Sequence, residues 1–242
     1  MAVLCGLRGL YVSENEIIEY GRALNARVHE LWLSKRGYPT WRLKYRTLYG
    51  PLRFQPSVLI IAINPGVDRA AVPDESAVST EPLALYDESY NPVEEECWSL
   101  AWKLTKLFDS ADARATYLKK RVYTNLLFFA STKINPDGGL GFYDNPEAIR
   151  HELESFCLNE VKKLIEKIQP KSILTIGKET FAKLLACAPF AGDWAEGLYD
   201  VRVPVFGVRF LNRFVSASNL AEMGPHLAEF GRRVGWSFGQ SA

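Results

Sequence analysis

The sequence predicts a single α/β domain in which helices flank a central, mostly parallel sheet of four to five strands, as a three-layer sandwich. Residues 58–63 form an unbroken apolar run, which is typical of a strand buried on both faces of a parallel sheet. Further short apolar runs alternate with helical patterns along the chain. No polar low-complexity stretch divides the 242 residues, so one hydrophobic core is expected.

The amino-terminal half begins with a helical pattern and contains the most apolar strand. Ser13 precedes Glu16 and an apolar pattern of helical spacing as far as Trp32, which predicts a capped amphipathic helix. After the strand at 58–63 comes a long acidic loop that contains Pro73, Pro82 and Pro92. Connections of that length are uncommon unless they are functional or mobile. A helix is then expected over 94–109, with acidic residues in its first turn.

Four further strands and three further helices are expected in the carboxyl half. Pro146 suits the first position of a long helix, which ends before Pro170. Pro204 cannot donate a hydrogen bond to a neighbouring strand, so its strand is expected at an edge of the sheet. The expected strands are 122–129, 172–176, 203–208 and 214–216, and the expected helices are 146–168, 179–186 and one from Ser218.

Composition narrows the class of protein. The apolar fraction of 48% and the charged fraction of 24% are typical of soluble globular proteins, and no apolar run is long enough to span a membrane. The first residues lack the basic start and apolar core of a signal peptide, so a cytoplasmic location is expected.

Metal and cofactor sites are not expected from the cysteine and histidine pattern. The cysteines are too far apart for a metal knuckle and the histidines form no pair at ligand spacing, so the cysteines are expected to be structural free thiols. The residues concerned are Cys5, Cys97, Cys157, Cys187, His29, His151 and His226.

Charge is unevenly distributed although the formal net charge is only +1. The stretch from Arg22 to Arg53 has eight basic residues and one acidic residue, whereas the stretch from Val72 to Glu96 has eight acidic residues and no lysine or arginine. Five aromatic residues lie within the basic stretch and a sixth directly follows it, a mixture suited to phosphate contact and base stacking. It is equally consistent with a solvated basic face, and both interpretations stay open. The aromatic residues are Trp32, Tyr38, Trp41, Tyr45, Tyr49 and Phe54.

Amides follow two of the expected strands. The strand at 58–63 runs into Asn64-Pro65-Gly66, and the strand at 122–129 contains Asn125. In open α/β sheets, ligands bind beyond the carboxyl ends of the strands, where Asn64 is expected. An isolated Asn-Pro-Gly is also a common turn.

Three segments, taken in order, are similar to motifs of the uracil-DNA glycosylase superfamily: Ile63-Asn64-Pro65-Gly66, Thr124-Asn125-Leu126, and Phe214-Val215-Ser216-Ala217-Ser218 leading into a helix. The resemblance covers about residues 55–236 and is closest to the mismatch-specific and single-strand-selective branches, whose first motif reads Asn-Pro-Gly. It implies one glycosylase-like domain over 1–242, in which residues 1–54 form a helical, basic and aromatic extension.

The resemblance implies roles for the two amides. Asn64 would hold the water that attacks the sugar, because a neutral amide can bind water but is a poor general base. Asn125 would read the extruded base, since a carboxamide can donate to O4 of uracil and accept from its N3–H. The alternative for Asn125 is a buried amide satisfied by the backbone. Ile63 would line the base site.

The resemblance also implies an aromatic residue that stacks on the base and groups that bind DNA phosphates. Tyr86, Tyr90 and Trp98 are candidates for stacking, with Tyr90 and Trp98 preferred, and each is equally suited to core packing. The groups expected at DNA phosphates are Gly66, Arg213, Ser218 and Asn219. For Ser218 and Asn219, a simple helix cap is the alternative, and both roles can hold together.

One motif departs from the family pattern. Where the family has His-Pro-Ser or Asn-Pro-Ser, this chain has Ser216-Ala217-Ser218. The missing His or Asn would stabilise negative charge on the departing base, and loss of one such donor typically costs about 10²–10³ in rate. Ser216 is the candidate replacement. Two functions therefore remain: a DNA glycosylase acting on uracil or a related deaminated base, or a relative that binds nucleic acid or nucleotide with weak or no catalysis.

Overall fold

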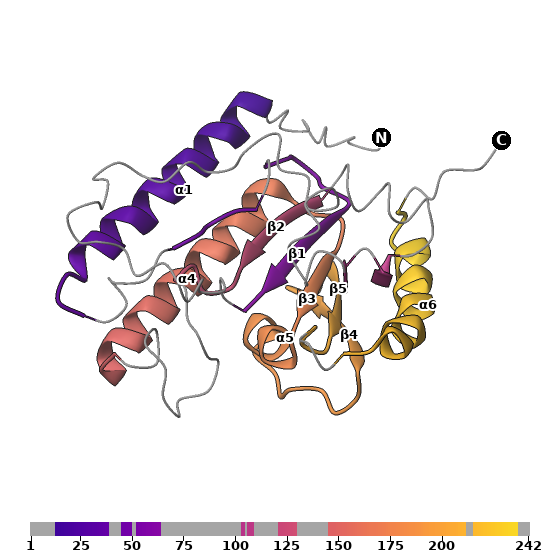
Figure 1. The fold of residues 1–242 in the computed structure, drawn as a ribbon. Coiled ribbons are helices and arrows are strands. Elements are labelled where there is room, and N and C mark those ends of the chain that lie inside the picture. The colour runs from indigo at the N-terminus through magenta and orange to yellow at the C-terminus, as the bar shows by residue number, and fades with distance from the viewer. Residues whose placement is uncertain are drawn as a thin grey trace, which may run out of the picture.

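The computed structural model describes residues 13–38, 45–49, 52–63, 103–104, 106–108, 121–129, 145–211 and 215–236. These residues form a five-stranded sheet with the order β2-β1-β3-β5-β4 (Figure 1). All neighbouring strands are parallel except β4, which runs antiparallel to β5. The predicted mostly parallel α/β fold is therefore confirmed. The strands are β1 (Val58–Ala62), β2 (Arg121–Asn125), β3 (Ile173–Ile176), β4 (Trp194–Tyr199) and β5 (Val203–Val208).

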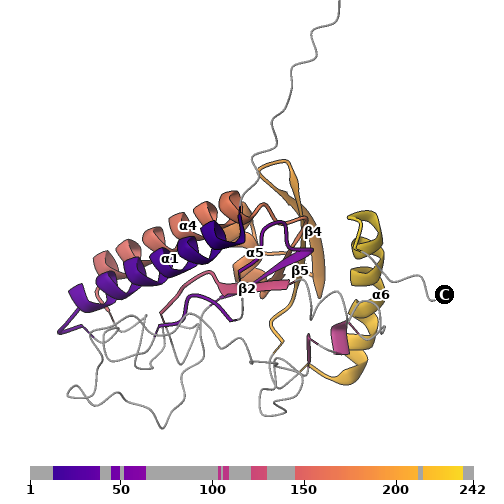
Figure 2. The same cartoon turned by 90° about the horizontal axis from the view of Figure 1, so that it is seen from above.

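Helices cover both faces of the sheet and make three layers (Figure 2). Apolar residues of α1, α4 and α5 pack against Leu59 and Ile61 on one face, and those of α6 pack with Ile60 and Ala62 on the other. This division follows from the strand period of two, which sends alternate residues to opposite faces. The helices are α1 (Glu14–Ser34), α4 (Glu147–Ile168), α5 (Lys178–Leu185) and α6 (Ala217–Arg233).

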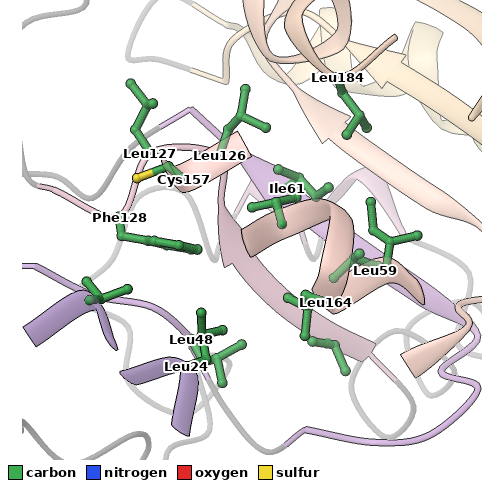
Figure 3. Packing of buried hydrophobic residues seen from close by; sticks show 14 of the residues in the cluster. Leu24, Leu48, Leu59, Ile61, Leu126, Leu127, Phe128, Cys157, Leu164 and Leu184 are labelled. Carbon is green, nitrogen blue, oxygen red and sulfur yellow. The ribbon is translucent and has the colours of Figure 1, made fainter. Parts of the chain in front are cut away.

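The core around β1 explains why this strand has no polar residue. All five of its residues are buried. Leu59 and Ile61 lie beside Leu164 of α4, and Phe128 and Cys157 belong to the same cluster (Figure 3). A strand with a partner on each side and helices on each face has no surface left for a polar side chain.

The ends of α1 and α4 agree closely with the sequence. Ser13 caps α1 and forms the expected capping box, in which Glu16 N donates to Ser13 Oγ (3.2 Å) and Ser13 N donates to Glu16 Oε2 (2.8 Å). Pro146 occupies the cap position of α4 rather than its first helical position. The helix ends at Gln169, whose φ of 49° is left-handed, directly before Pro170.

Part of the basic stretch is used inside the molecule. Arg27 of α1 binds Glu160 (Nη2 to Oε2, 2.6 Å), and Lys35, the C-cap residue of α1, binds Glu152 (Nζ to Oε1, 2.6 Å). These two ion pairs hold α1 and α4 in an antiparallel arrangement. Three of the aromatic residues, Trp32, Tyr45 and Tyr49, are buried. These three are not available for base stacking at the surface, which removes them from that interpretation of the basic stretch. Trp41 lies outside the described residues.

Glu160 provides a test of the α1–α4 packing. Burial by itself would raise the pKa of Glu160, but hydrogen bonds from Lys163 and Arg27 outweigh it and lower the pKa below 4.5. A depressed pKa in the folded state stabilises the fold above the pKa of the unfolded chain, and that stability is lost as pH falls through the folded value. Replacement by Ala leaves two half-exposed cations that can turn to water. We therefore expect Glu160→Ala to cost about 1–3 kcal/mol at pH 7.

Urea unfolding at pH 7 and below pH 4 checks this prediction. The difference in unfolding free energy between wild type and Glu160→Ala should shrink at the lower pH. Glu166→Ala, which removes an exposed carboxylate from the same helix, should change stability by no more than about 0.5 kcal/mol. An equal loss at both pH values would contradict the role given to the charged form of Glu160.

Two expectations about strands are wrong, and one strand was not predicted. The strand with Pro204 is not at the edge, because β4, which the sequence did not predict, pairs along its outer side. Pro204 is tolerated there since the parallel ladder between β3 and β5 begins one residue later, at Ile173 and Val205. Val215 and Ser216 are not in a strand, and Phe214 lies outside the described residues.

Two further boundaries differ from the expected ones. β2 ends at Asn125 rather than at 129, although Leu126 N and Leu127 N still donate to the carbonyl groups of Ala62 (2.7 Å) and Ile63 (2.8 Å). Of the helix expected over 94–109, residues 103–104 and 106–107 are helical, and residues 94–102 lie outside the described residues.

Candidate functional site

The carboxyl ends of the parallel strands meet at one edge of the sheet, which we call the carboxyl edge. It comprises the residues at or just after the ends of β1, β2, β3 and β5: Ile63, Asn125, Gly177 and Arg209. From β1 the chain continues to β2 on one side and later to β3 on the other. Such a reversal of strand order opens a crevice in which α/β proteins bind ligands.

Asn125 is the buried amide of this edge. It pairs in register with Ala62, two residues before Asn64, and its side chain is 1% exposed. Its Nδ2 donates to Tyr49 Oη (3.1 Å), whereas its Oδ1 is buried and has no hydrogen-bond partner. A buried acceptor without a hydrogen bond lowers the stability of a fold by about 1–3 kcal/mol. The alternative of an amide satisfied by the backbone therefore does not describe Asn125, and its Oδ1 is an open position for a donor from a ligand.

Several predicted site residues lie outside the described residues. Ile63 is the last described residue of the first motif, so Asn64 is the next residue along the chain. Asn125, Ile63, Ser216, Ser218 and Asn219 are described. Those outside are Asn64, Gly66, Tyr86, Tyr90, Trp98 and Arg213.

A pocket of about 260 Å³ opens at the carboxyl edge between the ends of β1, β3 and β5. Ile63 is the one predicted site residue among its lining residues. The volume is slightly below the usual range for ligand sites, about 300–1,000 Å³, and suits a small ring or part of a nucleotide. The lining residues are Ile63, Gly177, Lys178, Glu179, Thr180, Arg209 and Phe210.

The pocket and Asn125 lie on opposite faces of the sheet. Ile63 belongs to the core cluster of α1, α4 and α5, whereas Ala62, the partner of Asn125, belongs to the cluster of α6. Parallel neighbours in register point to the same face, so Asn125 faces α6. The sequence analysis expected Ile63 and Asn125 to line one base site. In the described part of the chain, Ile63 lines this pocket and Asn125 does not.

Arg209 and Phe210 were missed by the sequence analysis. Phe210 is 40% exposed at the pocket, and Arg209 Nη1 binds Asp193 Oδ1 (3.0 Å). Both residues directly follow β5. The same rule that singled out Asn64 after β1, that ligand-binding residues follow the carboxyl ends of parallel strands, would have found them.

Ser216, Ser218 and Asn219 form the start of α6. Ser216 is the N-cap, and the helix begins at Ala217, one residue earlier than expected. Its Oγ accepts from Asn219 N (3.2 Å) and lies 2.6 Å from Ser218 Oγ, while its backbone N donates to Asn219 Oδ1 (3.1 Å). The cap is therefore Ser216 rather than Ser218, and Asn219 takes part as the other half of the capping box. The remaining amides of the first helical turn stay suitable for an anion such as phosphate.

Other kinds of site find little support in the described part of the chain. It holds no group of three or more His, Cys, Asp or Glu side chains arranged to bind a metal ion, and none of its helices is long and apolar enough to cross a membrane. Burial raises the pKa of the Cys157 thiol to about 12, so this cysteine is a structural, unreactive side chain. Cys187 is exposed and free.

Comparison of the chain with protein-family models and with curated proteins gives no match.

Proposed function

We propose that the protein is a monofunctional DNA glycosylase that hydrolyses the N-glycosidic bond of an extruded uracil or related deaminated base. The observation that carries the proposal is the buried Asn125 Oδ1, which lacks a partner at the carboxyl edge. A buried acceptor is tolerated at a functional site when a ligand supplies its donor. The resemblance of the first motif to Asn-Pro-Gly glycosylases supports the choice of reaction.

The proposed reaction needs two amides with different tasks. Asn64 orients a water molecule that attacks C1′ of the sugar as the bond to the base nitrogen breaks. The electron pair leaves with the base, the sugar gains the hydroxyl of the water, and the remaining proton of the water ends on the departed base. Asn125 Oδ1 accepts from N3–H of uracil, and the second N–H of Nδ2 donates to O4. No lysine occupies a motif position, so a covalent intermediate is not part of the proposal.

DNA is the proposed partner and base excision repair the proposed process. The first turn of α6, with Ser218 and Asn219, would bind a phosphate beside the flipped nucleotide. Gly66 and Arg213 are proposed to contact the same backbone. A cytoplasmic location and a reaction without metal or cofactor complete the proposal.

The second candidate is a relative with weak or no catalysis that keeps the base pocket. The arrangement of Ser216 favours it, because its hydroxyl is engaged by Asn219 N and lies against Ser218 Oγ. A hydroxyl held in a helix cap is a poor substitute for the His or Asn that would stabilise a departing base.

Labelled oligonucleotides distinguish these candidates. Single- and double-stranded substrates carrying uracil, hypoxanthine or a mismatched thymine are incubated with the protein, and any abasic sites are cleaved with alkali. Scission at one of these bases is the result expected of a glycosylase. Binding that weakens with salt but gives no scission would favour the second candidate. If the protein neither cleaves nor binds any of these oligonucleotides, both candidates are rejected.

A further inference from the structure

The two edges of the sheet differ in the described part of the chain. β2, at one end, is covered by the segment 45–49, which forms antiparallel bridges from Tyr45 to Phe129 and from Leu48 to Thr124. β4, at the other end, pairs with β5 on its inner side, and no described segment pairs with its outer side (Figure 1). An uncovered edge strand is a template for pairing with another chain.

The register between β4 and β5 fixes which backbone groups of β4 point outward. Arg209 N donates to the carbonyl of Asp193 (2.8 Å), so these two residues form a hydrogen-bonded pair of the antiparallel ladder. Hydrogen-bonded and non-hydrogen-bonded pairs alternate along such a ladder. The residue after Asp193, and every second residue from there, therefore directs its N–H and C=O away from β5. These outward residues are Trp194, Glu196 and Leu198.

The side chains of the outward residues lie on the face of α6 and include two exposed apolar groups. Trp194 stacks on His226 with 4.5 Å between ring centroids, and Glu196 Oε1 binds Arg233 Nη2 (2.5 Å). Trp194 is 36% exposed and Leu198 is 57% exposed. The strand has no lysine or proline, which commonly protect an edge, and the charge of Glu196 is balanced by Arg233.

The outer edge of β4 is complementary to itself. A twofold axis through Glu196 pairs this residue with its own copy, and pairs Trp194 of each copy with Leu198 of the other. The outward residues then form three hydrogen-bonded pairs, each with two bonds, and the exposed apolar side chains meet on one face. Ala195 lies opposite Gly197, and small residues suit the closer spacing of such non-hydrogen-bonded pairs.

Other registers of the same pairing are worse. A shift by one residue sets outward backbone groups against inward ones, so the hydrogen bonds are lost. A shift by two residues keeps fewer pairs and places the carboxylate of Glu196 against Trp194 or Leu198. The register with the most hydrogen bonds is therefore also the one that joins the apolar side chains.

We propose that the outer edge of β4 is a dimer interface, at which a second copy of this chain adds its own β4 antiparallel and the two sheets become one. The two Glu196 carboxylates face each other across the axis, with about 5.5 Å between their Cα atoms, and each is neutralised by its own Arg233. Because the segment 45–49 covers the other edge of each sheet, the assembly stops at two copies. This inference does not depend on the proposed reaction.

Analytical ultracentrifugation of the full chain at a series of protein concentrations measures the dimer dissociation constant. Leu198→Lys should raise this constant by about 10-fold or more, because it removes both contacts with Trp194 and brings two charges to the interface. Tyr38→Lys is the matched control, since it places the same charge at another exposed apolar residue, away from β4. It should leave the constant unchanged. Circular dichroism checks that both variants are folded.

A second pair of variants tests the register. Arg233→Gln leaves the facing carboxylates unneutralised, so it should raise the dissociation constant by about 5–10-fold at pH 7, and adding Glu196→Gln should restore it. Arg232→Gln, which breaks the neighbouring pair with Glu229, should have no effect. A protein that is monomeric at every concentration, a dimer indifferent to Leu198→Lys or to Arg233→Gln, or an assembly larger than two copies would each overturn the proposal.

Discussion

Replacement of Asn64 by Ala is expected to reduce the rate of uracil release by about 10²–10⁴-fold, the usual contribution of a group that positions or activates a nucleophile. Asn64 directly follows Ile63, the residue after the end of β1. We expect the neighbouring buried strand β1 to position its amide, so that a water bound there is aligned before reaction. Alanine cannot hold that water.

Single-turnover scission of a uracil oligonucleotide measures this effect. Asn64→Asp should keep activity, because a carboxylate can also bind and activate the water. Asn159→Ala, which removes an exposed amide from α4, should leave the rate unchanged. Full activity in Asn64→Ala would show that the water is held elsewhere and would remove the first motif from the mechanism.

Replacement of Asn125 by Ala is expected to lower kcat/KM for uracil by about 10²–10³-fold and to abolish discrimination between bases. The substitution removes both polar atoms that would read the base. Loss of the hydrogen bond to Tyr49 Oη costs about 0.5–1.5 kcal/mol, but the unpaired Oδ1 is removed as well. We therefore expect the variant to fold, so that the functional loss is separable from stability.

The matched control is Thr124→Val. Thr124 is the preceding residue of β2 and points to the opposite face, where its hydroxyl binds the carbonyl of Thr47. This variant should lose stability and retain base selectivity, as measured with the oligonucleotide panel. Unchanged selectivity in Asn125→Ala would mean that another group reads the base and that the open Oδ1 has no role in recognition.

The fold was largely predictable because its signals are local. A run of six apolar residues predicts a central strand at 58–63, and Ser13 with Glu16 predicts a helix start, since both depend on neighbours in the chain. β4 was missed because Trp194–Tyr199 has an irregular apolar pattern, and its strand conformation comes from pairing with β5. The edge position predicted from Pro204 was wrong for a similar reason. Whether a proline disturbs a strand pairing depends on where the ladder begins, and the ladder between β3 and β5 begins at Val205, after Pro204.

The amino-acid sequence alone fixes which residue types follow the strands, and it directed attention to Asn64 and Asn125. Three further features depend on how the chain packs: the burial of Asn125 with its Oδ1 unpaired, the hydrogen bond from its Nδ2 to Tyr49 Oη, and the pocket at Arg209 and Phe210. Tyr49 and Asn125 are 76 residues apart. No local pattern encodes such a contact, because it arises when two distant segments pair along one edge of the sheet.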